Sequence, residues 1–496
     1  MSLPPDLERA REAIRHYAVE AGLDFFEVSF EVLDWHQMNV VASYGGFPSR
    51  YPHWRFGMEY EQISKSYEYG LSKIYEMVIN NDPSYAYLLY SNGLVDQKMV
   101  MAHVYAHSDF FKNNVYFAST NRKMIDEMGN HRSKVTNMIN KIGLDEVESF
   151  IDCLLTLENL IDLRQIGLQI PHPKGQSEEE PEDDDEVLNK FPSKDYMDTY
   201  VNPKEFLDGQ REKSEKKKKD KKFPEHPERD VLMFLGENAP LERWQRDLLW
   251  ILREEAYYFA PQGMTKIMNE GWAAYHHSQI MTTKALEDSE IIDYADHHSG
   301  TVAPHPGRLN PYKLGMELFR WIEEKWNKGK FGPEYEACEN LKEKLAWDKK
   351  LGLGRRKIFE IRKLYNDVTF LDDFLDEEFC HQQKFFLYGY NPATKVYEIV
   401  DRDFKKVKAK LLQKLTNMSQ PRIEVIDGNA SNRSELTLRH AHDGVDLRQD
   451  WAWEVLKNLH RIWKRPVHLE TLVDGMPKVL TFDGEDKKEQ RLVDRP

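Results

Sequence analysis

The sequence predicts an α+β protein with a large, mainly helical body and a small C-terminal α+β domain. Through most of the first 380 residues, apolar side chains recur with the 3.6-residue period of amphipathic helices. A highly charged segment interrupts this pattern, with eight acids in the nine positions from Glu178 to Glu186 and lysines filling most of Lys216 to Lys222. Beyond Cys380 the apolar period changes to two, which is typical of strands.

Residues 1–170 are predicted to form the first half of the helical body. An amphipathic helix at 5–22 should end at Gly22, and an irregular aromatic stretch around Tyr44–Trp54 should pack across the helices. Further helical patterns follow at 59–80, 94–114 and 121–163. The charged segment 171–229 cannot bury enough apolar surface to fold and is expected to be a solvated, disordered linker.

Residues 230–380 should form the second half of the body, organised around the stretch Trp244–Met281. It is predicted to contain two helices separated at Pro261-Gln262-Gly263, because proline and glycine together stop a helix. A loop rich in glycine, proline and histidine, Asp293–Pro311, is expected next, as a binding lid or a packed connection, before a helix that runs through Trp326.

The C-terminal domain is assigned to residues 381–484, with a tail at 485–496. Its expected helices are Phe404–Leu415 and Trp451–Trp463. Its expected strands are Phe385–Tyr390, Val396–Val400, Arg422–Asp427, Leu436–His440, Val467–Leu472 and Val479–Phe482.

Composition narrows the classes of function. The formal charge of −15 argues against a nucleic-acid-binding protein, which needs a basic face. Three widely spaced cysteines suit a reducing cytosol and do not form a disulfide framework. Neither a signal peptide nor a run of ~18 apolar residues is evident, so we expect a cytoplasmic protein without a membrane span.

The strongest chemical candidate is the pair His103 and His107, which are four residues apart on a predicted helix and share its apolar face. Glu270 lies on another apolar helical face, and His131 lies on a third. Two histidines and a glutamate from a second helix are the zincin-like ligand set for zinc or another divalent transition metal. His103, His107, Glu270 and His131 are therefore the candidate metal ligands.

One departure from the zincin motif matters, because Val104 occupies the position of its general base. Glu255 is the first choice for a base and Glu254 the second, with His277 as a further ligand or transition-state donor. Two alternatives stay open: the histidines are hydrogen-bonded core residues, or the groups form a carboxylate–histidine dimetal site in a helix bundle. In the loop, His298, His305 and Arg308 are candidates for binding an anionic substrate or for hydrogen-bonding within the loop.

Several long motifs resemble the SpoVR (stage V sporulation protein R) family. They are HSDFFKNN at 107–114, WQRD at 244–247, REEAYYFAPQ at 253–262, MNEGWA at 268–273, HSGTVAPHPGRLNP at 298–311 and RPVHLET at 465–471. The resemblance covers nearly the whole chain outside the charged segment. It implies a role in sporulation through spore-cortex formation, or in the stress response of bacteria that do not sporulate, together with a serine protein kinase and a von Willebrand-type partner.

Two hypotheses follow. The first is a metal-dependent hydrolase acting on an amide bond, which the peptidoglycan of the spore cortex would suit as a related substrate. The second is a non-enzymatic stress-response scaffold that works with the serine protein kinase system, in which the buried polar groups are a structural network. The hydrolase hypothesis requires His103, His107 and Glu270 to meet at one point.

Overall fold

A computed structural model describes residues 3–68, 76–166, 223–303 and 309–492. The chain divides into two compact units, Met1–Phe150 with Glu254–Gln420, and Ile151–Arg253 with Pro421–Pro496. Each unit is thus assembled from two separate stretches of sequence. Of the charged segment expected to be a linker, only residues 223–229 are among those described.

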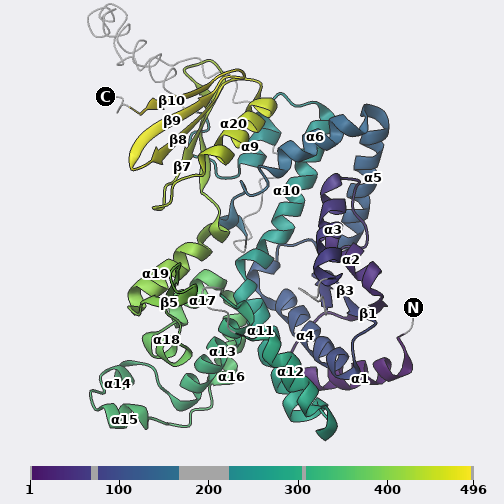
Figure 1. The fold of residues 1–496 in the computed structure, drawn as a ribbon, viewed down its shortest axis with the longest axis vertical. Helices are drawn as coiled ribbons and strands as arrows, with labels where there is room; N and C mark the ends of the chain where they lie inside the picture. Colours follow the sequence, from purple (N-terminus) through teal and green to yellow (C-terminus); the bar gives the residue numbers. More distant parts are fainter. Residues whose placement is uncertain (1–2, 69–75, 167–222, 304–308, 493–496) are drawn as a thin grey trace, which may run out of the picture. The chain divides into compact units, whose positions relative to one another are not determined.

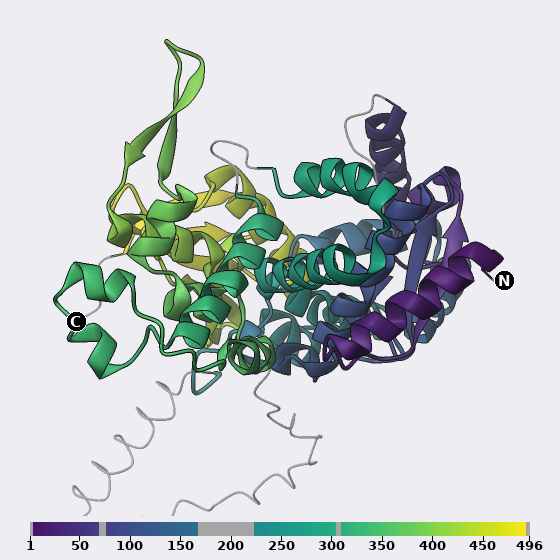
Figure 2. The same cartoon turned by 90° about the horizontal axis from the view of Figure 1, so that it is seen from below.

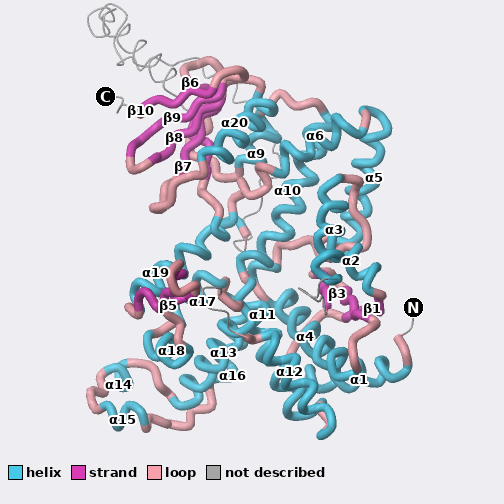
Figure 3. Tube along the Cα trace, in the orientation of Figure 1, coloured by secondary structure: helices cyan, strands magenta, loops and turns pink. Residues whose placement is uncertain are grey.

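A helical body and a C-terminal sheet domain are confirmed, and the described strands form three separate sheets (Figure 3). The helices that lie in the first unit or extend into it are α1 (Pro5–Glu20), α2 (Trp35–Ser43), α3 (Trp54–Glu68), α4 (Leu94–Asn113), α5 (Met124–Ile142), α6 (Leu144–Leu155), α10 (Arg243–Met264), α11 (Lys266–Ile280), α12 (Ile291–Thr301), α13 (Pro311–Lys328), α14 (Pro333–Glu336), α15 (Leu341–Leu345), α16 (Gly354–Leu364), α17 (Asp367–Phe374), α18 (Glu377–Gln383) and α19 (Phe404–Leu415). None of the described helices is both long and apolar enough to traverse a bilayer.

The first unit contains a small sheet that the sequence analysis did not predict. Its order is β1-β3-β2, formed by Val28–Leu33, Ser84–Leu89 and Glu76–Ile79, with β1 parallel and β2 antiparallel to β3. The helix expected at 59–80 was wrong at its end, because α3 stops at Glu68 and β2 begins at Glu76. Strand β3 is buried almost throughout, so its residues lack the alternation that identifies a half-exposed strand.

Helices α4, α11 and α13 pack together in the core of this unit (Figure 1). Most residues of α4 are buried, which suits a helix surrounded by other elements. The crossing of α11 and α13 depends on two glycines. A Cβ on Gly271 would lie 2.4 Å from the Gly315 backbone, and one on Gly315 would lie 2.1 Å from the carbonyl oxygen of Ile267.

The break expected at Pro261–Gly263 was wrong in position. Helix α10 continues through Pro261 to Met264, and α11 begins at Lys266. Pro261 has no N–H and so removes one helical hydrogen bond. It lies in the last turn of α10, so only a few helical residues follow it. The start of α11 is fixed by Asp367, whose carboxylate accepts hydrogen bonds of 2.8 Å from the backbone N–H groups of Ile267 and Met268.

The expected loop Asp293–Pro311 is partly helical, because α12 covers Ile291–Thr301. At its other end, α13 starts with Pro311 at the first helical position, and the Asn310 side chain accepts from the backbone N–H of Lys313. Residues 304–308 lie outside the described part of the chain.

The second unit contains α9 (Val231–Asn238), α20 (Gln449–Trp463) and a five-stranded sheet of order β10-β9-β8-β7-β6. Its strands are β6 (Ile423–Ala430), β7 (Glu435–His440), β8 (Val467–Val473), β9 (Met476–Phe482) and β10 (Lys487–Arg491). Helix α20 connects the parallel neighbours β7 and β8 and packs against the sheet. Strand β10 was not predicted, since all its residues are exposed and none is apolar.

This unit begins its last stretch at Pro421 rather than at residue 381. The hairpin of β4 (Leu387–Asn391) and β5 (Val396–Asp401), with α19, belongs to the first unit. Phe385, Phe404 and Leu411 explain this, because their side chains pack against the large core of the helical body.

Candidate metal centre

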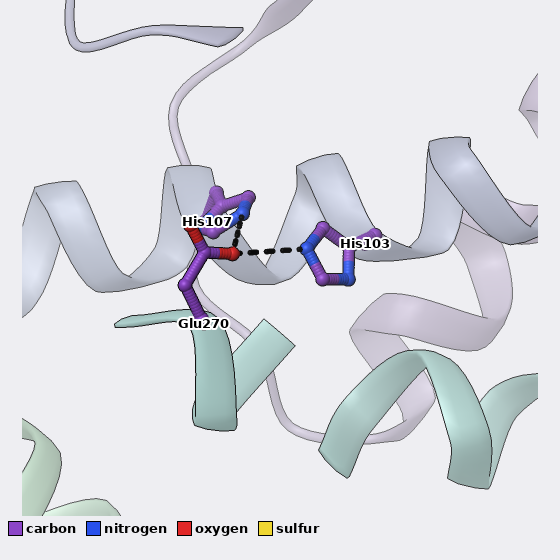
Figure 4. A group of neighbouring side chains, drawn as sticks. All are labelled: His103, His107 and Glu270. Atoms are coloured by element: carbon purple, nitrogen blue, oxygen red, sulfur yellow. Dashed lines mark ion pairs between the residues drawn. The ribbon is translucent and has the colours of Figure 1, made fainter. Parts of the chain in front are cut away.

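Helices α4 and α11 bring His103, His107 and Glu270 together (Figure 4). The two histidines are one turn apart on α4, so their rings project in the same direction toward Glu270 on α11. Glu270 Oε2 lies 3.6 Å from His103 Nε2 and 3.5 Å from His107 Nε2. All three side chains are buried, with exposed fractions of 3%, 4% and 6%.

These distances indicate what the three groups can hold. They exceed the ~2.7–3.2 Å of an ordinary N–H···O hydrogen bond. A tetrahedral ion with bonds of ~2.0–2.1 Å to histidine nitrogen and carboxylate oxygen would separate its ligand atoms by roughly 3.4 Å. The separations of 3.5 and 3.6 Å therefore suit neighbouring ligands of one ion better than a direct hydrogen bond.

Each imidazole is oriented by a partner on Nδ1, the ring nitrogen other than the one nearest Glu270. His107 Nδ1 donates to Asn269 Oδ1 at 2.8 Å, which leaves Nε2 of a neutral ring as a lone-pair acceptor facing Glu270. His103 Nδ1 lies 2.8 Å from His277 Nδ1. When His103 is the donor in that pair, its Nε2 is an acceptor as well.

His277 continues a chain of imidazoles away from the cluster. Its Nε2 lies 3.0 Å from Nδ1 of His298 on α12, which is half-buried. Burial, reinforced by the nearby histidines, holds the pKa of His277 well below its usual value. Burial also lowers the pKa of His298, with Arg320 adding to the effect. Both rings are therefore neutral at pH 7, with a lone pair on one nitrogen of each.

Glu270 supplies the negative charge of the cluster. Burial opposes its ionisation, but His103, His107 and Lys266 outweigh burial and hold its pKa well below the usual range. Lys266 Nζ donates to Oε1 at 2.5 Å. Oε2, which faces the histidines, accepts no hydrogen bond from the residues that the structure describes. A buried carboxylate oxygen without such a bond is costly unless a cation satisfies it.

His131, Glu254 and Glu255 form a different cluster, on α5 and α10. His131 Nδ1 donates to Glu255 Oε1 at 3.0 Å, and Arg50 donates to Glu255 Oε2 at 2.5 Å. Burial opposes protonation of His131, but Glu254 and Glu255 raise its pKa to about 9. Both carboxylate oxygens of Glu255 already accept hydrogen bonds, one from His131 and one from Arg50. Glu255 is therefore better suited to orienting His131 than to accepting a proton from a water beside His103.

Of the three candidates for anion binding, His298 lies on the chain of imidazoles, whereas His305 and Arg308 fall outside the described residues. Three further residues at these clusters were not predicted from the sequence: Asn269, Arg50 and Glu127. Two of these had a usable signal: Asn269 directly precedes Glu270, and Glu127 is four residues before His131 on one helix. Nothing in the sequence connected Arg50 with Glu255, because the two are far apart along the chain.

The fold and this cluster define a mainly helical protein with a buried group of two histidines and one carboxylate, a donor set that binds divalent metals. The chain belongs to the SpoVR family. Residues 3–420 match the family described as SpoVR like protein, and residues 421–474 match the SpoVR-like C-terminal domain. The boundary between the two matches coincides with the start of the last stretch of the second unit.

A relative is the "Uncharacterized protein YcgB" of Escherichia coli (strain K12). It is 28% identical over 486 residues, which cover 90% of this chain and 88% of the relative. No solved structure gives a significant match.

Proposed function

We propose that this chain is a metal-dependent hydrolase whose divalent ion, zinc or another transition metal, is held by His103, His107 and Glu270. The observation that carries the proposal is the approach of Glu270 Oε2 to two imidazole nitrogens at separations that suit a shared ion. For His107 and Glu270, two acceptors face one another, so either a proton or a cation must lie between them.

Three protein ligands leave a further position for water, which is the arrangement of catalytic rather than structural zinc sites. A divalent ion lowers the pKa of a bound water and thereby supplies a nucleophile near neutral pH. The same donor set also suits non-haem iron, so the test below compares zinc, manganese and iron.

The protein's own groups would then move the proton. His277 is in contact with His103, and His298 extends the chain toward a less buried position. We assign the role of proton acceptor to this pair in preference to Glu255, which is bonded to His131 and Arg50. Amide hydrolysis fits this arrangement because the leaving amine must also receive a proton.

The substrate class rests on the family. Its connection with sporulation and cortex formation makes an amide bond in a peptidoglycan fragment the first substrate to test. The buried ligands, each under a tenth exposed, favour a small reacting group over a folded protein.

The test is amide hydrolysis by the full-length, untagged protein. N-acetylmuramoyl peptides and simple N-acyl amino acids are incubated with the protein as purified, after chelator treatment, and after zinc, manganese or iron is restored. We expect release of free amine that chelator abolishes and one metal restores. The variant H103A/H107A should be inactive, whereas H440N, which changes a buried histidine in the second unit, should retain activity. Chelator-insensitive release, or full activity in H103A/H107A, would overturn the proposal.

A second candidate function rests on the β4–β5 hairpin. Figure 2 shows it, in light green, as a long two-stranded arm. Its large apolar side chains are exposed: Tyr388, Tyr390, Val396, Tyr397, Ile399 and Val400. Such a patch is typical of a protein-docking site, which suits the scaffold hypothesis with a serine protein kinase as partner. Co-purification of that kinase with the wild type, but not with a Tyr390→Ser/Val400→Ser variant, would support this role.

A further inference from the structure

We infer that Glu127, His131 and Glu254 form a second divalent-cation site, separate from the one proposed for His103, His107 and Glu270. Glu127 and His131 are one turn apart on α5, and Glu254 reaches them from α10. One ligand atom from each residue lies within 4.8 Å of the other two. The inference does not depend on hydrolase activity.

The arrangement around His131 has the spacing of ligands rather than of hydrogen bonds. Nε2 lies 3.4 Å from Glu254 Oε2 and 3.5 Å from Glu127 Oε1. Both distances are longer than an ordinary N–H···O bond of ~2.7–3.2 Å. They are close to the roughly 3.4 Å expected between ligand atoms of one ion with ~2.0–2.1 Å bonds.

His131 is buried, at 0% exposure, and its Nε2 makes no hydrogen bond with any described residue. Its other nitrogen is fixed, since Nδ1 donates to Glu255 at 3.0 Å and Arg50 holds the second Glu255 oxygen. A carboxylate on the far nitrogen of a histidine is the usual support for a metal ligand, because it sets the tautomer and aims the lone pair of Nε2.

The two carboxylates give the site access to solvent. The side chain of Glu254 is 44% exposed and that of Glu127 is 26% exposed, so a cation can enter with water completing its coordination. Two weaker neighbours compete for these oxygens. Lys134 Nζ lies 3.6 Å from Glu127 Oε1, and Asn121 Nδ2 donates to Glu254 Oε1 at 3.4 Å. Lys134 is itself more than half exposed and can withdraw into solvent.

One imidazole with two carboxylates is an oxygen-rich donor set, which suits Mn²⁺ or Zn²⁺ better than a thiolate-seeking ion. The rival arrangement is an imidazolium held between acidic groups, without any metal. Both arrangements need the same three side chains, so the decisive difference is whether an added divalent ion binds.

The test is equilibrium dialysis of full-length, untagged, chelator-treated protein against Mn²⁺ and, separately, Zn²⁺, with bound metal counted by elemental analysis. Working in the H103A/H107A background removes the other site. We expect about one ion per chain in that background, and at least a tenfold weaker affinity after Glu127→Gln and Glu254→Gln are added. Both glutamines replace partly exposed carboxylates and should leave the fold intact.

Asp126→Asn with Asp247→Asn is the matched control, because it removes two exposed acids from the same two helices outside the cluster. Its affinity should equal that of the background. If H103A/H107A does not fold, the same count is made in otherwise wild-type protein, where the two glutamines should lower the stoichiometry by about one ion. A background that takes up neither ion, or equal binding with and without the glutamines, would overturn the inference.

Discussion

Asn269 is the residue that determines which ring nitrogen of His107 is the acceptor facing Glu270. Its side-chain oxygen accepts the Nδ1 proton at 2.8 Å and so leaves Nε2 as the acceptor that a metal requires. Asn269 is buried and adjacent to Glu270 on α11, so one helix supplies both a ligand and the group that orients another ligand.

We therefore predict that Asn269→Ala lowers metal affinity by about 10–100-fold while the protein stays folded. Asn269→Asp, which keeps an acceptor at the same place, should retain most of the affinity. Competition with a chromophoric chelator measures both. Wild-type affinity in Asn269→Ala would show that the Asn269–His107 bond does not orient a ligand.

His276 is a buried histidine of the opposite kind. It packs among the rings of Trp272, Tyr275 and Phe359, and neither ring nitrogen has a hydrogen-bond partner among the described residues. Burial, with Arg355 and Arg362 adding to it, holds its pKa well below the usual value. His276 is therefore neutral in the folded protein, and its protonation favours unfolding.

His276→Phe should be at least as stable as the wild type at pH 8, because it removes a buried polar ring without partners. Below the unfolded-state pKa of ~6.5, the unfolded wild type binds a proton that the folded form refuses, so stability falls as pH falls. For each unit by which the pH falls, the free energy of unfolding of His276→Phe should decrease by up to ~1.4 kcal/mol less than that of the wild type. Urea unfolding at pH 8 and 5.5 checks this, with the exposed His381→Phe as control; parallel pH dependence in wild type and His276→Phe would contradict it.

At the scale of elements, the position of Glu270 depends on how closely α11 approaches α13. Gly315 allows the contact, since a Cβ there would lie 2.1 Å from the carbonyl oxygen of Ile267 and 2.7 Å from the Cα of Gly271. Both neighbours are backbone atoms and cannot rotate away. Asp367 fixes the first turn of the same helix, and burial raises the pKa of Asp367 to about 7.

Gly315→Ala should push the two helices apart, destabilise the protein by ~1–3 kcal/mol and weaken metal binding through displacement of Glu270. Gly57→Ala is the matched control. Gly57 also lies in a helix, but nothing is within 4 Å of its added Cβ, so alanine should stabilise by up to ~1 kcal/mol. Thermal unfolding and chelator competition measure both effects. A stable Gly315→Ala protein with wild-type affinity would show that α11 tolerates displacement.

For the whole molecule, periodicity predicted the elements whose two faces differ. Helix α19 was predicted with its observed bounds, and α20 and strands β6 to β9 were predicted within a few residues. A strand that is buried on both faces carries no such contrast, which is why β3 was missed. The hairpin β4–β5 was predicted as a pair of strands, but only the packing of Phe385 and Phe404 shows which unit holds it.

The candidate site was predictable only in part, for a related reason. Helical spacing placed His103 beside His107, and an apolar face made Glu270 an inward-pointing group. Spacing within one helix does not reveal which other helix packs against it. His131 was therefore grouped with His103, although the structure groups it with Glu127, Glu254 and Glu255.

The most direct test of the central claim is the metal content of the full-length protein purified without an affinity tag. Elemental analysis should find about one transition-metal ion per chain more in the wild type than in H103A/H107A, with H440N equal to the wild type. A metal that binds only the folded state stabilises that state, so chelator should also lower the melting temperature of the wild type by more than that of H103A/H107A. Equal metal content in wild type and H103A/H107A, with the same response of the melting temperature to chelator and to added zinc in both, would contradict a metal centre at His103, His107 and Glu270.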